Sequence, residues 1–175
     1  MFSKRDYATN LGMLVANLHS LEFRLRAFLS KLPHARPNGL PWDVNLYSFP
    51  VGRELPESDI TSYATLGRMI ADYNKNATAY KIGVPISTDI VPLRDALAHG
   101  RAAATSGFEN PCLIKFSPAK RGHVTVVYNA EMNEQWFTAN ITLLSEALDK
   151  INAALSEASR RWPESPPKSA KSSTL

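Results

Sequence analysis

Apolar residues recur at alternating intervals of four and three positions along residues 4–32. This spacing keeps them on one face of an α-helix. The stripe consists of Tyr7, Leu11, Leu14, Leu18, Leu21, Leu25, Phe28 and Leu32. We therefore predict a long first helix that buries one face against other helices. A dimeric coiled coil fits less well, because charged residues crowd positions 22–31 and further apolar residues widen the stripe.

The same periodicity predicts two more long helices. One covers residues 58–80, and Ser58 or Asp59 can cap its first turn. The other covers residues 133–161, where apolar residues again step by four and three. Together with a shorter helix between them, these segments predict a mainly α-helical fold.

The shorter helix is expected to start after Ser87, Thr88 or Asp89, each of which can cap it. Pro92 is compatible with this helix because it falls in or near the first turn, where its missing N–H is not needed. We predict that the helix ends at Gly100 or slightly beyond, with the glycine in a left-handed C-cap.

Two stretches interrupt the helical pattern. Residues 33–56 hold five prolines, which exclude a continuous helix, so we predict a long ordered loop with a short extended piece at Val44–Val51. Residues 112–129 are rich in β-branched and aromatic residues on either side of a polar connection. They predict a β-hairpin with strands at Cys112–Phe116 and His123–Tyr128.

Composition adds limits on the class of protein. The single cysteine, Cys112, excludes an internal disulfide framework and a multi-cysteine zinc site. No apolar run is long enough to span a membrane and the first residues lack a signal-peptide core, so we expect a cytoplasmic protein without a membrane partner. The net charge is +4, of which +2 comes from residues 156–175, so charge alone is weak support for nucleic-acid binding.

The C-terminal residues 162–175 are polar and rich in proline and lysine, which predicts a disordered tail after a single domain of residues 1–161. Deleting residues 163–175 is expected to leave the midpoint of thermal unfolding nearly unchanged, because they offer almost no apolar surface to bury. Calorimetry of the full and truncated chains measures this, and a large drop would show that the tail docks on the domain.

The most informative stretch for chemistry is the end of the third helix. Asp95 and His99 are four residues apart, so the carboxylate can reach the imidazole and favour its charged form. Arg94 precedes His99 by five residues, which is about 7.5 Å along a helix axis and roughly 140° around it. One helix therefore aims Arg94 and His99 poorly at the same small group, whereas two copies of the helix could converge on it.

The order Arg94, Asp95, three further residues and His99, near the end of a helix, resembles the motif of the HEPN superfamily. The resemblance implies an antiparallel four-helix HEPN-like bundle, here with a long loop after helix 1 and a small β-hairpin between helices 3 and 4. Many members are metal-independent ribonucleases or RNA-binding relatives, often dimers with both motifs at the interface. The resemblance thus implies RNA as partner, a homodimer, no cofactor and no metal ligand.

The resemblance also assigns catalytic roles to Arg94, His99 and Asp95. An imidazole can take the proton of the 2′-hydroxyl and a second one can protonate the leaving 5′-oxygen, giving a 2′,3′-cyclic phosphate and a 5′-hydroxyl. Arg94 would hold the phosphate and Asp95 would orient the imidazole. Many relatives are toxins or antiphage defence components, which implies such a role and a protein inhibitor as a further partner.

Basic residues near these elements are candidates for contacts with RNA phosphates. Arg101 follows the motif directly, and Lys120 and Arg121 lie at the expected tip of the hairpin. The alternative for the tip is an ordinary solvated turn. His19, beside the stripe of the first helix, is expected to be packed or exposed rather than to act as a ligand.

A second hypothesis is a catalytically silent HEPN-like module for dimerisation or RNA binding. In that case Asp95 would pair with His99, and Arg94 would be tied to a neighbouring carboxylate. The nuclease requires both motifs to open to one shared cleft, whereas the silent module does not.

Overall fold

The computed structural model describes residues 3–35, 46–104 and 109–163. Within these ranges the chain forms four α-helices, one 3₁₀ helix and three β-strands, so it is mainly helical with a small sheet, as predicted. The order is α1 (Lys4–Ser30), η1 (Leu46–Ser48), α2 (Leu66–Ala79), α3 (Ile90–His99), β1 (Arg101–Ala103), β2 (Cys112–Phe116), β3 (Val126–Glu131) and α4 (Glu134–Arg161). None of the described helices has both the length and the apolar content needed to span a membrane.

The fold divides into two compact units, each assembled from segments that are distant in sequence. The first unit comprises residues 1–22 and 86–150, and the second comprises residues 23–85 and 151–175. The first unit therefore holds α3, the three strands and the N-terminal parts of α1 and α4. The second holds η1, α2 and the C-terminal parts of α1 and α4.

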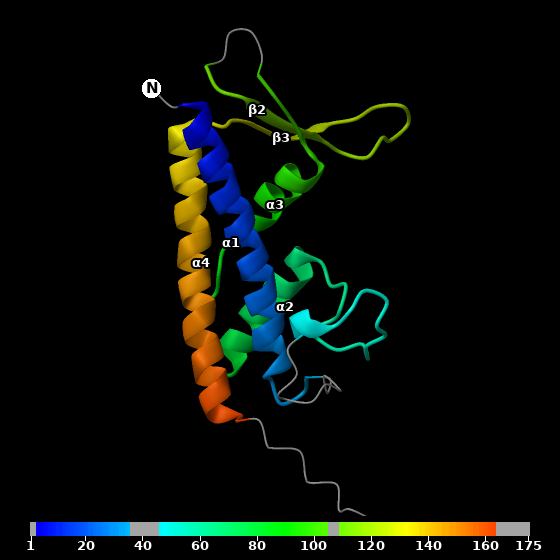
Figure 1. Cartoon of the computed structure of the whole chain (residues 1–175), viewed down its shortest axis with the longest axis vertical. Coiled ribbons are helices and arrows are strands. Elements are labelled where there is room, and N and C mark those ends of the chain that lie inside the picture. The colour runs from blue at the N-terminus through cyan, green and yellow to red at the C-terminus, as the bar shows by residue number, and fades with distance from the viewer. Residues whose placement is uncertain (1–2, 36–45, 105–108, 164–175) are drawn as a thin grey trace, which may run out of the picture. The chain divides into compact units, whose positions relative to one another are not determined.

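The first unit is built around apolar side chains from α1, α3, β2 and α4. In this unit α1 and α4 lie side by side, and the ring of Tyr7 meets the ring of Phe137 edge-on at 5.7 Å (Figure 1). Helix α3 contacts β2. The buried side chains are Leu14, Leu18, Leu21, Ile86, Ile90, Leu93, Ala96, Leu113, Met132, Phe137, Leu144 and Ala147.

The second unit has its own core, in which α2 is the central element. The ring of Phe28 meets that of Tyr73 at 4.9 Å, which joins the end of α1 to α2. Trp162, just after α4, packs edge-on against Tyr80 at 5.1 Å. The buried side chains are Leu25, Phe28, Leu32, Leu66, Met69, Ile70, Tyr73, Ala77, Ile82, Ile151, Ala154 and Ala158.

The start of α2 differs from the prediction. The helix begins at Leu66 rather than at residue 58, and Thr65 caps it by accepting a hydrogen bond from the N–H of Arg68 at 3.3 Å. Ser58 instead closes a turn in which its N–H donates to the hydroxyl oxygen of Thr61 at 2.8 Å. Several hydroxyl residues in this segment can cap a helix, and such side chains also stabilise turns, so the sequence does not select one.

Helix α3 has its predicted extent, with Pro92 in its first turn and Gly100 after its last residue. The predicted left-handed cap is wrong, because Gly100 has φ −78° and ψ −178°, which is extended backbone. The chain runs directly from Gly100 into β1, a three-residue strand that the sequence pattern does not reveal.

The predicted hairpin is present as part of a three-stranded antiparallel sheet with the order β1-β2-β3. Strand β2 has the predicted bounds, but β3 starts three residues later than predicted, at Val126. Arg121 and Gly122 have φ values of 52° and 78° and form a tight turn. Lys120 and His123 flank this turn and exchange backbone hydrogen bonds of 2.8 and 3.1 Å.

Part of the predicted loop and tail lies outside the described residues. The extended piece expected at Val44–Val51 is wrong for residues 46–48, which form η1, while residues 44 and 45 are outside the description. Of the tail predicted at 162–175, residues 164–175 are outside it as well.

Tyr73 gives the second unit a testable pH dependence. Its buried hydroxyl donates to the carbonyl oxygen of Val84 at 3.0 Å, and burial raises the pKa of Tyr73 from 10.0 to about 12. As the pH rises from 10.0 to about 12, Tyr73 loses its phenolic proton in the unfolded chain but keeps it in the folded chain. The stability that the protonated Tyr73 provides below pH 10 is therefore lost as the pH rises to about 12.

Replacing Tyr73 by phenylalanine is expected to lower the free energy of unfolding at neutral pH by about 1 kcal/mol, because the carbonyl of Val84 loses its donor. The loss of stability above pH 10 should also become smaller in the variant. Urea unfolding at pH 7 and at pH 11 measures both effects. Tyr63→Phe is the matched control, since the side chain of Tyr63 is fully exposed, and an equal response of both variants would contradict the assignment.

Candidate functional site

Arg94 joins α3 to α1 within the first unit. Its Nε donates to Oε1 of Glu22 at 3.3 Å, and its Nη1 donates to Oδ1 of Asp95 at 3.4 Å. Arg94 is held between two carboxylates, as the silent-module hypothesis predicted for this residue.

Asp95 uses its other oxygen to bind the sheet. Lys115 of β2 donates from Nζ to Oδ2 of Asp95 at 3.2 Å. Within the described residues the partners of Asp95 are thus Arg94 and Lys115, and the expected contact with His99 is not formed. Spacing along α3 permits Asp95 to reach His99, but the ammonium group from β2 binds the carboxylate instead, and sequence spacing could not show this.

Glu22, Arg94, Asp95 and Lys115 form a line of alternating charge, which we call the charge chain. Two members are acidic and two are basic, so the charge chain is formally neutral. The exposed fractions of its side chains range from 21% for Lys115 to 39% for Asp95. Ion pairs with this much solvent contact are typically worth less than about 1 kcal/mol each. A phosphate could therefore compete with a carboxylate for Arg94 at little cost in stability.

A cavity of about 290 Å³ lies beside the charge chain in the first unit. Glu22 and Arg94 line it from α1 and α3, so the guanidinium lies at its wall. The other lining residues are mostly apolar: Val15, Leu18, His19, Leu97 and Ala98. A partly apolar hollow with a cation at its wall is suited to an anionic group that carries an apolar or aromatic part.

His99 lies in the last turn of α3 and is exposed to solvent. It is not among the residues that line the cavity beside Arg94. A single α3 therefore does not bring His99 to the cavity that Arg94 lines, in agreement with the helical geometry expected from their spacing.

Arg101 lies on the sheet face away from α3. It is paired with Ile114 across β1 and β2, and its guanidinium carbon lies 5.4 Å from the centre of the Phe116 ring. Successive side chains of a strand point to opposite faces, and Lys115 points to Asp95 on α3. Arg101 is thus separated by the sheet from the charge chain.

Lys120 and Arg121 occupy the turn between β2 and β3 and are exposed. Their exposure leaves them free to meet an anion, but they belong to a different part of the first unit from Arg94. The structure brings Arg94, Asp95 and Lys115 together and leaves Arg101, Lys120 and Arg121 apart from them.

Two residues near Arg94 were not predicted as part of the site. His19 and Glu22 are three apart on α1 and both line the cavity with Arg94. Their spacing places them on one helix face, but no local signal shows that this face meets α3. A contact between residues 72 positions apart can be found only from the fold.

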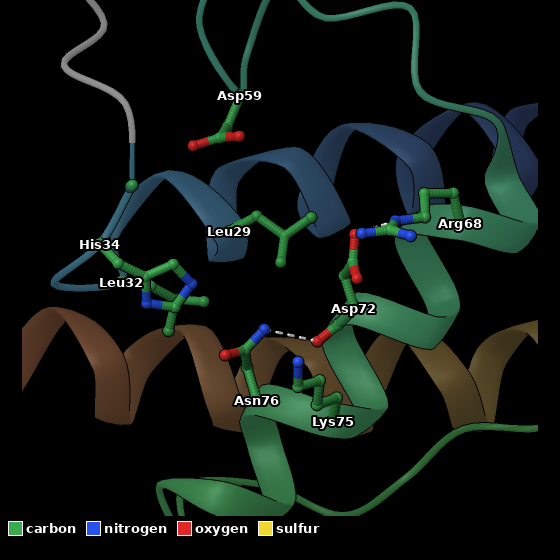
Figure 2. A pocket seen from close by; sticks show the side chains of 9 residues that line it. Leu29, Leu32, His34, Asp59, Arg68, Asp72, Lys75 and Asn76 are labelled. Carbon is green, nitrogen blue, oxygen red and sulfur yellow. Dashed lines mark hydrogen bonds and ion pairs between the residues drawn. The ribbon is translucent and has the colours of Figure 1, made fainter.

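The second unit has a cavity of its own, of about 400 Å³ (Figure 2). Along α2, Nε of Arg68 contacts Oδ2 of Asp72 at 2.8 Å, and Nδ2 of Asn76 donates to the backbone oxygen of Asp72, also at 2.8 Å. Because cations and carboxylates alternate here, the lining favours no single sign of charge. The lining residues are Leu29, Leu32, His34, Ala35, Asp59, Arg68, Asp72, Lys75 and Asn76.

No group of three or more His, Cys, Asp and Glu side chains in the described ranges is arranged to hold a metal ion. Comparisons with known proteins add no family to these observations: no protein-family model, no curated protein and no solved structure matches the chain. The functional interpretation therefore rests on the residues of α1, α3 and the sheet described above.

Proposed function

We propose that this chain is a metal-independent RNA endonuclease of the HEPN type. The observation that carries the proposal is the position of the motif: Arg94 and His99 both lie in α3, and both reach the surface. The proposal includes an antiparallel four-helix bundle and a homodimer with the two α3 helices near the two-fold axis. It also includes a cytoplasmic setting in toxin or antiphage defence, with a protein inhibitor as a further partner.

Two copies of α3 would supply the groups that the reaction needs. One His99 would remove the proton of a ribose 2′-hydroxyl, and the His99 of the partner subunit would protonate the leaving 5′-oxygen. Arg94 would exchange a carboxylate partner for the phosphate and stabilise the charge that develops on it. Asp95 contacts Arg94 rather than His99, so its proposed role becomes positioning of the guanidinium.

The test is incubation of the purified protein and of His99→Ala with mixed RNA in the presence of EDTA. Cleavage by the unchanged protein, with its loss in the variant, would support the nuclease. Chromatography of the RNA products beside reference fragments with known ends identifies the 5′ and 3′ ends that are formed. Cleavage that is equal in both proteins would refute it.

A second candidate is the catalytically silent module for dimerisation or RNA binding. It is favoured by the pairing of Arg94 with Glu22 and Asp95, which gives the arginine a structural role. This candidate predicts that RNA is bound at most and is not cut, either by the unchanged protein or by Arg94→Lys. The same incubation separates the two candidates.

A further inference from the structure

Strand β3 forms an edge of the sheet. In the order β1-β2-β3 it is paired with β2 on one side only. Its first residues and those just before it carry large exposed apolar side chains: Val124 is 55% exposed, Val126 is 49% exposed and Val127 is 51% exposed. Among the residues that the structure describes, no strand pairs with its outer edge, and its apolar side chains are in solvent.

Such an edge normally carries a feature that prevents pairing with another chain, such as lysine, proline or an inward-pointing charge. Residues 124–130 contain no charged residue and no proline. Valine, threonine and tyrosine, which favour strands, make up most of the segment. The edge is therefore suited to accept a further strand.

We propose that β3 pairs in antiparallel fashion with β3 of a second copy of this chain, to give one sheet with three strands from each copy. The charges at the two ends of the segment favour this occupant. Lys120 and Arg121 precede it, whereas Glu131 and Glu134 follow it. Antiparallel pairing places the basic end of each copy beside the acidic end of the other.

A two-fold axis at Val127 gives each residue of the segment 124–130 a cross-strand neighbour in the second copy. In this register Val126 lies opposite Tyr128 of the partner subunit, and Val124 lies opposite Ala130 of the partner subunit. His123 is then level with Glu131 of the partner subunit, and because Lys120 is paired with His123 across the turn, the basic turn lies near that carboxylate. Apolar side chains meet apolar side chains, and opposite charges meet at both ends, which are the favourable cross-strand combinations.

We call this pairing of β3 with β3 of the second copy the seam. The seam also places the two motifs on one side of the joined sheet. A two-fold axis perpendicular to the sheet keeps both α3 helices on the same face, since each contacts its own β2. The two β2 strands are three strand spacings apart, or about 14 Å. Closely packed helices lie about 8–10 Å apart, so the α3 helices would flank a groove. The use of this groove for RNA rests on the proposed function, whereas the seam does not.

Val127→Lys tests the seam directly, because two lysines would face each other at the axis. Light scattering and sedimentation of the full chain should show a dimer at micromolar concentration. The variant is expected to raise the dimer dissociation constant by at least about tenfold, since like charges directly opposite repel. Val51→Lys is the control, because Val51 is fully exposed and belongs to the second unit.

A charge exchange tests the register. Lys120→Glu and Glu131→Lys are each expected to weaken the dimer, and the two together in one chain should restore it. Dimers that respond to the single changes and are rescued by the double change support the seam. A monomeric unchanged protein would overturn it, as would a dimer that is indifferent to Val127→Lys, or pairing of β3 with an extended peptide in place of a second copy.

The outcomes distinguish the seam from the nuclease. A dimer that dissociates on Val127→Lys but does not cleave RNA supports the seam and refutes the nuclease. RNA cleavage by a protein whose dimer ignores both tests refutes the seam alone. Circular dichroism of each variant shows whether the sheet and helices are retained, so that unfolding is not mistaken for dissociation.

Discussion

His99→Ala is expected to lower the rate of RNA cleavage by about 100-fold or more, which is the usual scale for a general acid–base group. Alanine removes the imidazole from an exposed position in the last turn of α3. The substitution creates no cavity in the core, and alanine favours helix. The rate should therefore fall while the midpoint of thermal unfolding stays nearly the same.

Arg94→Lys is expected to impair cleavage severely although the positive charge is kept. Lysine has a compact ammonium group and cannot donate two parallel hydrogen bonds to a phosphate. Because exposed ion pairs contribute less than about 1 kcal/mol, the effect on folding should be small. A large loss of activity with little loss of stability would separate catalysis from the structural role that the silent module gives to Arg94.

The products should be a 2′,3′-cyclic phosphate and a 5′-hydroxyl, and a DNA of the same sequence should not be cut, because it lacks the 2′-hydroxyl. Cleavage should persist in EDTA. His34→Ala is the matched control, since His34 is exposed in the second unit and contacts Tyr80 rather than the motif. Cleavage that survives both Arg94→Lys and His99→Ala, requires magnesium or proceeds on DNA would exclude this mechanism.

Long apolar stripes made the helices predictable. The stripe of α1 appears in the structure as six buried side chains from Leu14 to Leu32, because period alone determines which face of a long helix is apolar. In α4 the buried face includes Ala147, Ala154 and Ala158 beside Phe137, Leu144 and Ile151. Alanine gives little hydrophobic signal in a sequence, yet its small size permits close packing.

Short elements and contacts between distant residues were not predictable. The three residues of β1 are too few to show a period, and they become a strand because β2 pairs with them. The start of α2 depended on a choice among several hydroxyl residues. Lys115 donates a hydrogen bond to Asp95, although the spacing along α3 would also permit His99 to do so. Glu22 accepts a hydrogen bond from Arg94 and belongs to a different helix. The motif itself could be read from six residues, but its partners depend on the tertiary fold.

Gly100→Ala is expected to lower the free energy of unfolding by about 1–3 kcal/mol, the range for forcing extra atoms into a packed site. The reason is space rather than backbone conformation, because extended φ and ψ values suit any residue. A Cβ atom at this position would collide with the backbone oxygen of Ala96. It would also lie 2.9 Å from Cδ1 of Leu113 and 3.0 Å from the backbone oxygen of Ile114.

Backbone oxygens cannot move aside as the end of a long side chain can, so the last turn of α3 and β2 would have to separate. Gly12→Ala is the matched control, since Gly12 lies within α1 and a Cβ atom there would meet nothing within 4 Å. It should stabilise the protein by about 0.5–1 kcal/mol, because glycine costs that much relative to alanine inside a helix. Urea unfolding of the two variants measures the opposite shifts.

A Gly100→Ala variant as stable as the unchanged protein would show that α3 and β2 are not in such close contact. If the shift is found, the same variant should also cleave RNA poorly, because His99 lies in the displaced turn. Gly12→Ala should keep full activity. A glycine that does not touch the substrate would then determine the position of the imidazole, through the contact between α3 and β2.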